Sequence, residues 1–207
     1  MKAEPLSLTT RELTTQTWPD FETLFSQGNG WDFCWCMAFQ RDKPLPGSLH
    51  RTRAERSVVN HRDKRELVCQ GRSHGVLVYD GGAPIGWCQY GRKDELPLMD
   101  GRRGRFAKPP LDGVPAEDWR VTCFVVAKKY RRRGVAATAL RAVLAAIGDA
   151  GGGLVEGYPL DLATKDRWGP GTWSDYGHFG TVSMFEAEGF TRVGMLRPTN
   201  AIMHKDV

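Results

Sequence analysis

Apolar residues at helical spacing predict four helices along the chain. The clearest is amphipathic, because Ala136, Leu140, Val143, Leu144 and Ile147 recur in steps of three and four residues. A short helix is expected to begin at Thr17-Trp18-Pro19-Asp20 and to stop at Gly28. The polar stretch 51–70 keeps one narrow apolar face, as a solvated helix does. The fourth helix is predicted over residues 182–188.

Short β-branched and apolar runs predict the strands. Residues 76–79 and 85–88 flank Asp80-Gly81-Gly82, and glycine supplies the positive φ that a tight antiparallel hairpin needs. Residues 121–126 and 154–158 flank the amphipathic helix, which predicts a parallel pair joined by a right-handed crossover. The last two strands, 190–195 and 201–204, are expected to pair. The predicted class is α+β with a mixed sheet.

Length and composition exclude several classes of protein. With 207 residues, 41% of them hydrophobic and 26% charged, the chain is typical of a globular protein, and we expect one domain over residues 1–207. Neither a membrane span nor a signal peptide is recognisable, so a cytoplasmic location is expected. The five cysteines are an odd number, which favours reduced thiols. A net charge of +5 permits an anionic partner.

The junction between residues 123 and 136 carries the most informative chemistry. A strand that leads directly into a helix exposes unpaired N–H groups at the helix start, where the helix dipole adds positive charge. Gly134 and Ala136 are small enough to let a pyrophosphate approach the main chain, and the arginines at 131–133 add charge. The pattern is neither a dinucleotide-binding fingerprint nor a P-loop. It therefore predicts a different phosphate-bearing ligand.

Two motifs resemble those of the GNAT N-acetyltransferase superfamily. Arg131-x-x-Gly134-x-Ala136 is similar to its acyl-CoA-binding motif, and Met184-Phe185-Glu186-Ala187-Glu188-Gly189-Phe190 is similar to its later helix with a Gly-Phe ending. The order of predicted elements over about residues 6–205 also fits. The segments Cys34-Trp35-Cys36-Met37, Gly86-Trp87-Cys88 and Val155-Glu156-Gly157-Tyr158-Pro159 resemble a bacterial subgroup. The resemblance implies a GNAT-like mixed, mostly antiparallel central sheet flanked by helices.

The resemblance also implies acetyl-CoA as acyl donor, and the residues themselves lead us to expect no metal. The main chain of the strand would pair with the pantetheine arm, the amides that follow would hold the pyrophosphate, and an N–H near Val126 would stabilise the oxyanion. The implied cofactor-binding residues are Phe124, Val125, Val126, Arg131, Arg132, Arg133, Gly134, Val135 and Ala136.

Candidate catalytic residues lie on the predicted strand 154–158. An alkyl amine with a pKa of about 10.4 is almost entirely protonated near neutral pH, so a proton acceptor is useful. Glu156 is the candidate base, since an ionisable group within an apolar strand should face a cleft, and its alternative is a salt bridge with an arginine. Tyr158 shares its strand face and either donates a proton to the leaving thiolate or shapes the pocket.

Two residues depart from the family pattern. Phe185 stands where a tyrosine acid is frequent, and Arg120 stands where some members carry a glutamate base. Tyr176 and His178 are candidate substitutes, although a histidine in such a loop is more often a packing residue.

The acceptor pocket is expected from the aromatic segment 31–39. Trp31, Asp32 and Trp35 are the predicted substrate-binding residues, with Asp32 attracting a cationic amine. The alternative is that alternate aromatics seal the core. Cys34-x-Cys36 could instead bind zinc with Cys69 or Cys88, but its spacing is tighter than usual. Cys123 lies in an apolar strand, which favours inert burial.

The leading function is therefore acetyl-CoA-dependent transfer of acetyl to an amine of a small molecule or peptide, without a covalent enzyme intermediate. One alternative is a CoA-binding sensor or interaction module without turnover. Another is a basic nucleic-acid binder that uses Arg102, Arg103, Arg105 and the arginines at 131–133. Late strands of this fold can mediate a homodimer.

Overall fold

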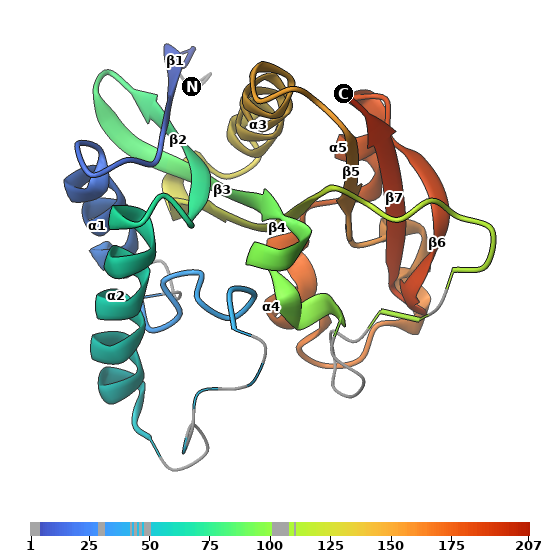
Figure 1. Ribbon diagram of the computed structural model, residues 1–207, viewed down its shortest axis with the longest axis horizontal. Coiled ribbons are helices and arrows are strands. Elements are labelled where there is room, and N and C mark those ends of the chain that lie inside the picture. The colour runs from blue at the N-terminus through green and yellow to red at the C-terminus, as the bar shows by residue number, and fades with distance from the viewer. Residues whose placement is uncertain are drawn as a thin grey trace.

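One mixed sheet runs through the part of the chain that the computed structural model describes, which is residues 5–28, 32–41, 43, 45, 47, 51–100, 108–109 and 111–207, without the side chains of Ser174 and Asp175. Its order is β1-β2-β3-β4-β5-β7-β6 (Figure 1). The strands are β1 (Leu8–Glu12), β2 (His74–Asp80), β3 (Ala83–Arg92), β4 (Trp119–Val126), β5 (Leu154–Gly157), β6 (Thr191–Arg197) and β7 (Asn200–Asp206). Only β4 and β5 pair in parallel among these strands, so the expected mostly antiparallel sheet is confirmed.

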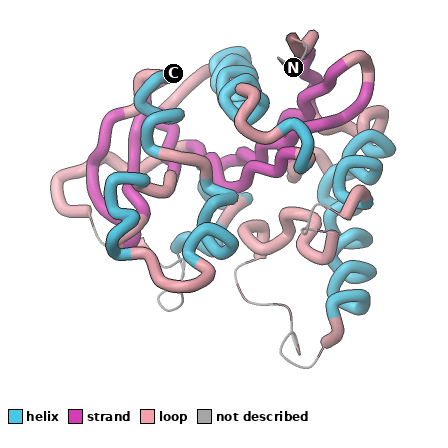
Figure 2. The backbone as a smooth tube through the Cα atoms, turned by 180° about the vertical axis from the view of Figure 1, so that it is seen from behind, coloured by secondary structure: helices cyan, strands magenta, loops and turns pink. Residues whose placement is uncertain are grey.

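Helices lie around this sheet, as the view from behind shows (Figure 2). They are α1 (Trp18–Ser26), α2 (Arg53–Cys69), α3 (Val135–Asp149), α4 (Thr172–Tyr176) and α5 (Val182–Ala187). The four helices predicted from the apolar spacing are confirmed as α1, α2, α3 and α5. In addition, short 3₁₀ helices form at η1 (Lys93–Glu95), η2 (Pro97–Asp100), η3 (Lys128–Tyr130), η4 (Leu162–Arg167) and η5 (Gly177–Phe179). None of the helices described is long and apolar enough to cross a membrane.

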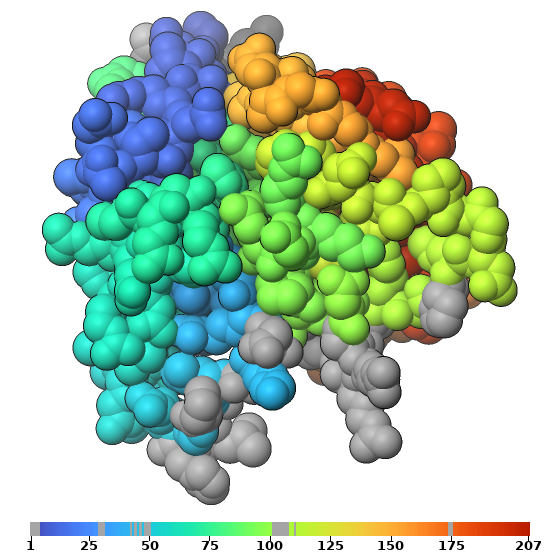
Figure 3. All heavy atoms as spheres, in the orientation of Figure 1, coloured from blue at the N-terminus to red at the C-terminus, as the bar shows by residue number. Residues whose placement is uncertain are grey.

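The two faces of the sheet bury two separate apolar clusters. Leu77 of β2 packs with α1 and with the segment 35–39 on one face, whereas its neighbours Val76 and Val78 pack with α3 on the other. This division follows from the alternation of side chains along a strand. In the space-filling view, α2 and the segment after β3 cover the face that carries α1 (Figure 3). We refer to this face as the α1 face.

α2 is long and mostly solvated, yet it starts at a well-defined residue. Thr52 and Glu55 form a reciprocal capping box, in which the Thr52 side chain accepts from the Glu55 N–H. Of its side chains, Lys64 and Val68 are buried against the α1 face. The helix therefore acts as an outer support for the segment 32–41.

β4 and β5 are paired over only a short distance. Their register runs from Trp119 opposite Val155 to Val121 opposite Gly157, where β5 ends. β4 continues to Val126, so its last residues have no partner on β5. This divergence leaves main-chain groups of β4 facing the space between the two strands.

The edge strand β1 was not expected from the sequence. Its residues 8–12 are mostly polar, and its burial pattern leaves four of five exposed. Because it pairs only with β2 among the described strands, no buried alternation is required of it. The connection from β3 to β4 contains η1 and η2.

Candidate functional site

The turn between β4 and α3 presents the start of a helix without a side-chain cap. η3 follows β4, Arg132 has φ 61°, and Gly134 at the N-cap has φ 82°. Left-handed φ values suit glycine, which has no Cβ to clash. No side chain caps the helix at Gly134, so the first N–H groups of α3 are available to an anion.

A cavity of about 720 Å³ opens at this turn. Every predicted cofactor-binding residue except Arg133 lines it, namely Phe124, Val125, Val126, Arg131, Arg132, Gly134, Val135 and Ala136. The guanidinium of Arg133 lies over the Tyr130 ring instead, 5.9 Å from its centroid. Lys128 and Tyr130 also line the cavity and add to its polar end. The structure thus brings the predicted cofactor residues together around one concave surface.

The opposite wall comes from the segment before α5 and from α5 itself. Gly177, His178, Gly180, Thr181 and Met184 line it. The φ of 79° at Gly180 favours glycine, and a Cβ there would also displace the terminal Met184 Cε atom, which would lie 2.5 Å away. The His178 ring packs 4.3 Å from that of Phe179. His178 therefore packs against a neighbouring ring and also lines the cavity, so it fits both a packing role and a role in catalysis.

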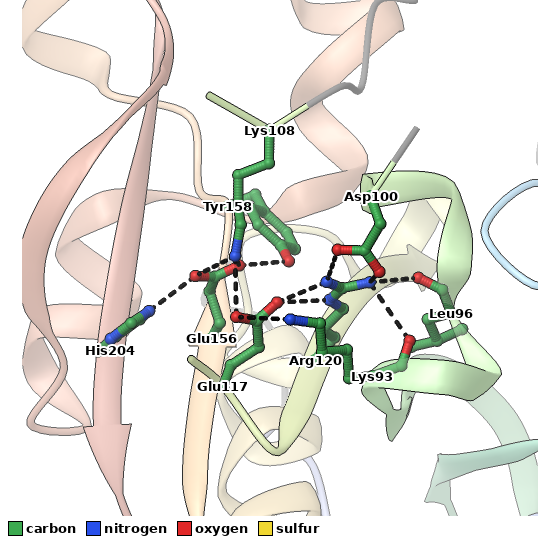
Figure 4. A network of polar contacts seen from close by, with 9 residues as sticks. All are labelled: Lys93, Leu96, Asp100, Lys108, Glu117, Arg120, Glu156, Tyr158 and His204. Atoms are coloured by element: carbon green, nitrogen blue, oxygen red, sulfur yellow. Dashed lines mark hydrogen bonds and ion pairs between the residues drawn. The ribbon is translucent and has the colours of Figure 1, made fainter. Parts of the chain in front are cut away.

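Glu156 and Tyr158 lie together (Figure 4), and neither of them lines this cavity. Tyr158 belongs to the apolar cluster of the α1 face. Both side chains are fully buried, and the Tyr158 hydroxyl donates to Glu156 Oε1 at 2.6 Å. Lys108 Nζ lies 3.0 and 3.1 Å from the two carboxylate oxygens, and His204 Nε2 lies 2.7 Å from Oε2. Burial and the Glu156 charge raise the pKa of Tyr158 well above its usual value. This geometry favours the salt-bridge alternative for Glu156, with a lysine and a histidine in place of an arginine.

Arg120 belongs to the same buried network. Its guanidinium donates to Asp100 at 2.6 and 2.9 Å, to Glu117 Oε1 from Nε at 2.9 Å, and to the Leu96 carbonyl at 2.7 Å (Figure 4). Burial would raise the pKa of Glu117, but hydrogen bonds from Lys108 and Arg120 outweigh it and lower that pKa to about 2. Arg120 therefore anchors the segment before β4 and leaves no carboxylate at this position of the strand.

The aromatic segment is divided between the core and the cavity. Trp31 lies outside the described residues. Asp32 forms an ion pair with Arg53, and its carbonyl accepts from Ser57 at 2.6 Å. Trp35 is buried and its ring stacks on that of Phe25 at 5.6 Å, so it fills the core as the alternative proposed. Phe33 is the described member of this segment that lines the cavity.

Some cavity residues were not anticipated from the sequence. Trp173 and Gly177 belong to the irregular stretch before α5, and Trp173 lines the cavity from α4. The glycine- and aromatic-rich composition of that stretch was the available signal. The arginines at 102, 103 and 105 lie outside the described residues. Among the residues that are described, no group of three or more His, Cys, Asp or Glu side chains could hold a metal ion.

The chain is similar to known acetyltransferases in sequence pattern and in fold. Residues 11–156 match the model of the acetyltransferase (GNAT) family. No curated protein matches the chain at a significant level. An acetyltransferase from Thermus thermophilus is similar in structure, with a TM-score of 0.51, 16% identity, and coverage of 99% of this chain and 100% of that one. The PaiA N-acetyltransferase from Thermoplasma acidophilum, solved with coenzyme A, has a TM-score of 0.52, 13% identity, and coverage of 98% and 100%.

Proposed function

Since the chain belongs to the GNAT family of acetyltransferases, we propose that it transfers acetyl from acetyl-CoA directly to an amine of a small molecule or peptide. The observation that carries this proposal is the single cavity that joins the unpaired end of β4 to the uncapped start of α3. These two features match the two ends of the donor, an amide-containing arm and a pyrophosphate. Acetyl-CoA supplies the activated acyl group as a thioester.

The chain's own groups suit this donor. The main chain of Phe124, Val125 and Val126 is available to pair with the pantetheine arm as an added strand would. The first amides of α3 and the Arg132 side chain face the pyrophosphate, where the helix dipole adds to the attraction. An N–H near Val126 stabilises negative charge on the acyl oxygen.

His178 is our candidate for moving the proton of the acceptor amine. Its ring lies in the cavity wall, and an imidazole titrates close to neutral pH. Glu156 and Tyr158 do not line the cavity, because Lys108 and His204 enclose them. We therefore propose that these two residues hold the walls of the site in place. The assignment of Glu156 as base and Tyr158 as acid stays a prediction. The second test described below examines Glu156 alongside His178.

The first test measures CoA binding by calorimetry with the full chain. Arg132→Ala should weaken CoA binding about tenfold, because it removes a charge-assisted contact to phosphate. Arg141→Ala is the matched control, since Arg141 is on α3 outside the cavity and pairs with Glu188. A folded wild-type protein without measurable CoA affinity would contradict the proposal.

The second test measures release of free CoA thiol from acetyl-CoA with a panel of amines. His178→Gln should lower the rate about 100-fold while leaving CoA affinity unchanged. If Glu156→Gln shows that split and His178→Gln does not, Glu156 is the base and our assignment is wrong.

A second candidate function is suggested by Arg120 and Phe185. These two residues stand where GNAT proteins often carry a glutamate base and a tyrosine acid. Arg120 is fully engaged in ion pairs, and Phe185 is buried against the Phe124 ring. A CoA-binding module without turnover fits these two substitutions. CoA binding without thiol release across the whole amine panel would favour it.

A further inference from the structure

Two cysteine thiols meet inside the protein, beside the proposed donor site. The Sγ atoms of Cys36 and Cys123 are 3.2 Å apart, and both residues are buried. Cys36 comes from the segment between α1 and α2, whereas Cys123 is on β4, immediately before Phe124 of the cavity wall. They are separated by 87 positions in the chain, so tertiary folding alone brings them together.

The backbone at Cys36 is held in an unusual conformation. Trp35 and Cys36 have φ values of 49° and 48°, a left-handed region that is unfavourable for a residue with a side chain. Gln89 Nε2 donates to the Cys36 carbonyl at 2.9 Å, and Thr122 donates to Gln89 Oε1 at 3.1 Å. Because Thr122 directly precedes Cys123, one buried chain of hydrogen bonds positions both cysteines.

This segment is also tied to α2. Ser57 donates to the Asp32 carbonyl at 2.6 Å, and Asn60 Nδ2 donates to the Phe33 carbonyl at 2.8 Å. Asp32 and Phe33 therefore sit at a fixed position a few residues before Cys36. Contacts from two elements thus maintain the approach of the two thiols.

A buried lysine supplies positive charge to this cluster. Lys64 of α2 is fully buried, its Nζ donates to Gln40 Oε1 at 2.7 Å, and it lies 5.5 Å from the centroid of a Trp87 ring. Burial lowers the pKa of Lys64 to about 8, and its electrostatic interaction with Cys36 opposes that shift. An ammonium group in such surroundings is stabilised by an anion nearby, and a thiolate fits that role.

The two thiols differ in acidity. Burial opposes ionisation of Cys36, but the hydrogen bond with Cys123 and the charge of Lys64 outweigh it and lower the pKa of Cys36. The same hydrogen bond, together with burial, raises the pKa of Cys123. Cys36 is therefore the more acidic thiol of the pair.

We propose that Cys36 and Cys123 form a redox-active dithiol, with Lys64 as the cation that activates Cys36, and that peroxides convert it into a disulfide. The Cys36 thiolate attacks hydrogen peroxide, so that an S–O bond forms, the O–O bond breaks and hydroxide leaves, which gives a sulfenic acid. Cys123 then attacks the Cys36 sulfur, and its proton leaves with the hydroxyl group as water. Two thiols are oxidised and one peroxide is reduced to two waters. A dithiol reductant reverses the change.

Disulfide formation reaches the donor site through β4. The sulfurs must approach from 3.2 Å to about 2.0 Å, and Cys123 is bonded directly to Phe124. A displacement of about 1 Å near reacting groups can lower a rate about 100-fold. This effect rests on the proposed function: we expect oxidation to lower the rate of acetyl transfer at least about tenfold and dithiothreitol to restore it.

The decisive experiment needs neither CoA nor an amine. The full chain is titrated with hydrogen peroxide, the remaining thiols are alkylated under denaturing conditions, and peptides are mapped by mass spectrometry. We expect a Cys36–Cys123 cross-link with loss of two hydrogen atoms, which dithiothreitol reverses. Cys36→Ser should abolish this cross-link, whereas Cys88→Ser, which alters a buried neighbour, should retain it. If Cys36 and Cys123 both remain alkylatable while the exposed Cys69 is oxidised, the proposal is wrong.

The role of Lys64 has its own readout. Lys64→Met should slow cross-link formation at least about tenfold, while Lys165→Met, at an exposed position, should leave it unchanged. If Lys64→Met does not fold, the pH profile of Cys36 alkylation in the wild-type chain decides instead. A midpoint below that of Cys69 supports the activated thiolate, and a midpoint at or above it contradicts the proposal. A reversible cross-link in a protein whose reduced form transfers no acetyl group would count against the proposed function alone.

Discussion

Three fully buried ionisable side chains on the α1 face are stabilised in three different ways. Arg120 pairs with two carboxylates, whereas Glu156 pairs with Lys108 and is hydrogen-bonded to His204. Lys64 instead has an amide oxygen, aromatic rings and nearby thiols. Because an amide and rings compensate a charge less well than a carboxylate does, Lys64 is the residue whose ionisation should depend most on its surroundings.

This difference predicts a pH-dependent contribution to stability from Lys64. Burial lowers its pKa from 10.5 to about 8. Between these values the native protein has lost the proton while the unfolded chain keeps it, so native stability rises as the pH rises through this window. Relative to Lys64→Met, the wild type should gain up to about 3 kcal/mol in free energy of unfolding. Urea denaturation at about pH 7 and pH 10 measures this.

The comparison of the two proteins removes the contribution of tyrosines and of thiols on which Lys64 does not act, which titrate in the same window. Lys165→Met, at an exposed site, should show no such trend against the wild type. A pH-independent difference between wild type and Lys64→Met would show that the ammonium is not destabilised by burial.

At the scale of elements, the two long helices begin in opposite ways. α2 starts with a capping box that satisfies its first N–H groups within the chain. α3 starts at a glycine whose missing side chain leaves these groups without a side-chain cap. Capping residues are worth about 1 kcal/mol to a helix, so the start of α3 is less stable than it would be with one. An anion bound at that position offsets the difference.

This contrast predicts different results for two substitutions. Gly134→Ala should lower the free energy of unfolding by about 1 kcal/mol, because φ is 82° there and no atom lies within 4 Å to clash. It should also weaken CoA binding several-fold. An alanine is strained at this φ, and relief of that strain would move the N–H groups at the start of α3. Thr52→Ala should cost about 1 kcal/mol as well, but leave CoA affinity unchanged. Urea denaturation and calorimetry separate the two effects, and equal CoA affinities in both variants would contradict this role of Gly134.

At the scale of the whole molecule, one polar network joins four parts of the chain. Lys108 and Asp100 come from the connection after β3, Arg120 from β4, Glu156 from β5 and His204 from β7 (Figure 4). These contacts hold the connection against the α1 face beside the diverging strands. Removing one charge would leave its partners buried and uncompensated, which is more costly than loss of a surface ion pair.

The network predicts an acid-sensitive contribution from Glu117. Its pKa is lowered to about 2 from an ordinary value of 4.5. The stability it provides is therefore complete above about pH 4.5 and is lost as the pH falls toward 2. The advantage of wild type over Glu117→Gln in free energy of unfolding should shrink by up to about 3 kcal/mol across this range. Chemical denaturation at several pH values measures it, with the exposed Glu186→Gln as control; an unchanged advantage at low pH would refute it.

The sequence alone determined the order of most elements and the junction between β4 and α3, where the helix starts at Gly134 without a side-chain cap. Both depend on local patterns, namely apolar spacing along a helix and the glycine that permits a positive φ at residue 134. It also predicted residues that now line the cavity, because Phe124 to Ala136 are neighbours in the chain. A site can be predicted from the sequence when the residues that form it are adjacent in the chain.

Only the tertiary structure decided where the isolated side chains point. Glu156 was expected to face a cleft, but Lys108 and His204, each 48 positions away, enclose it. Trp35 turned into the core while its neighbour Phe33 reached the cavity, and the polar strand β1 formed only because β2 offers it an edge. Charge compensation and strand pairing join residues that are distant in the chain. The local pattern of apolar and polar residues does not identify such partners, so the sequence alone could not predict these contacts.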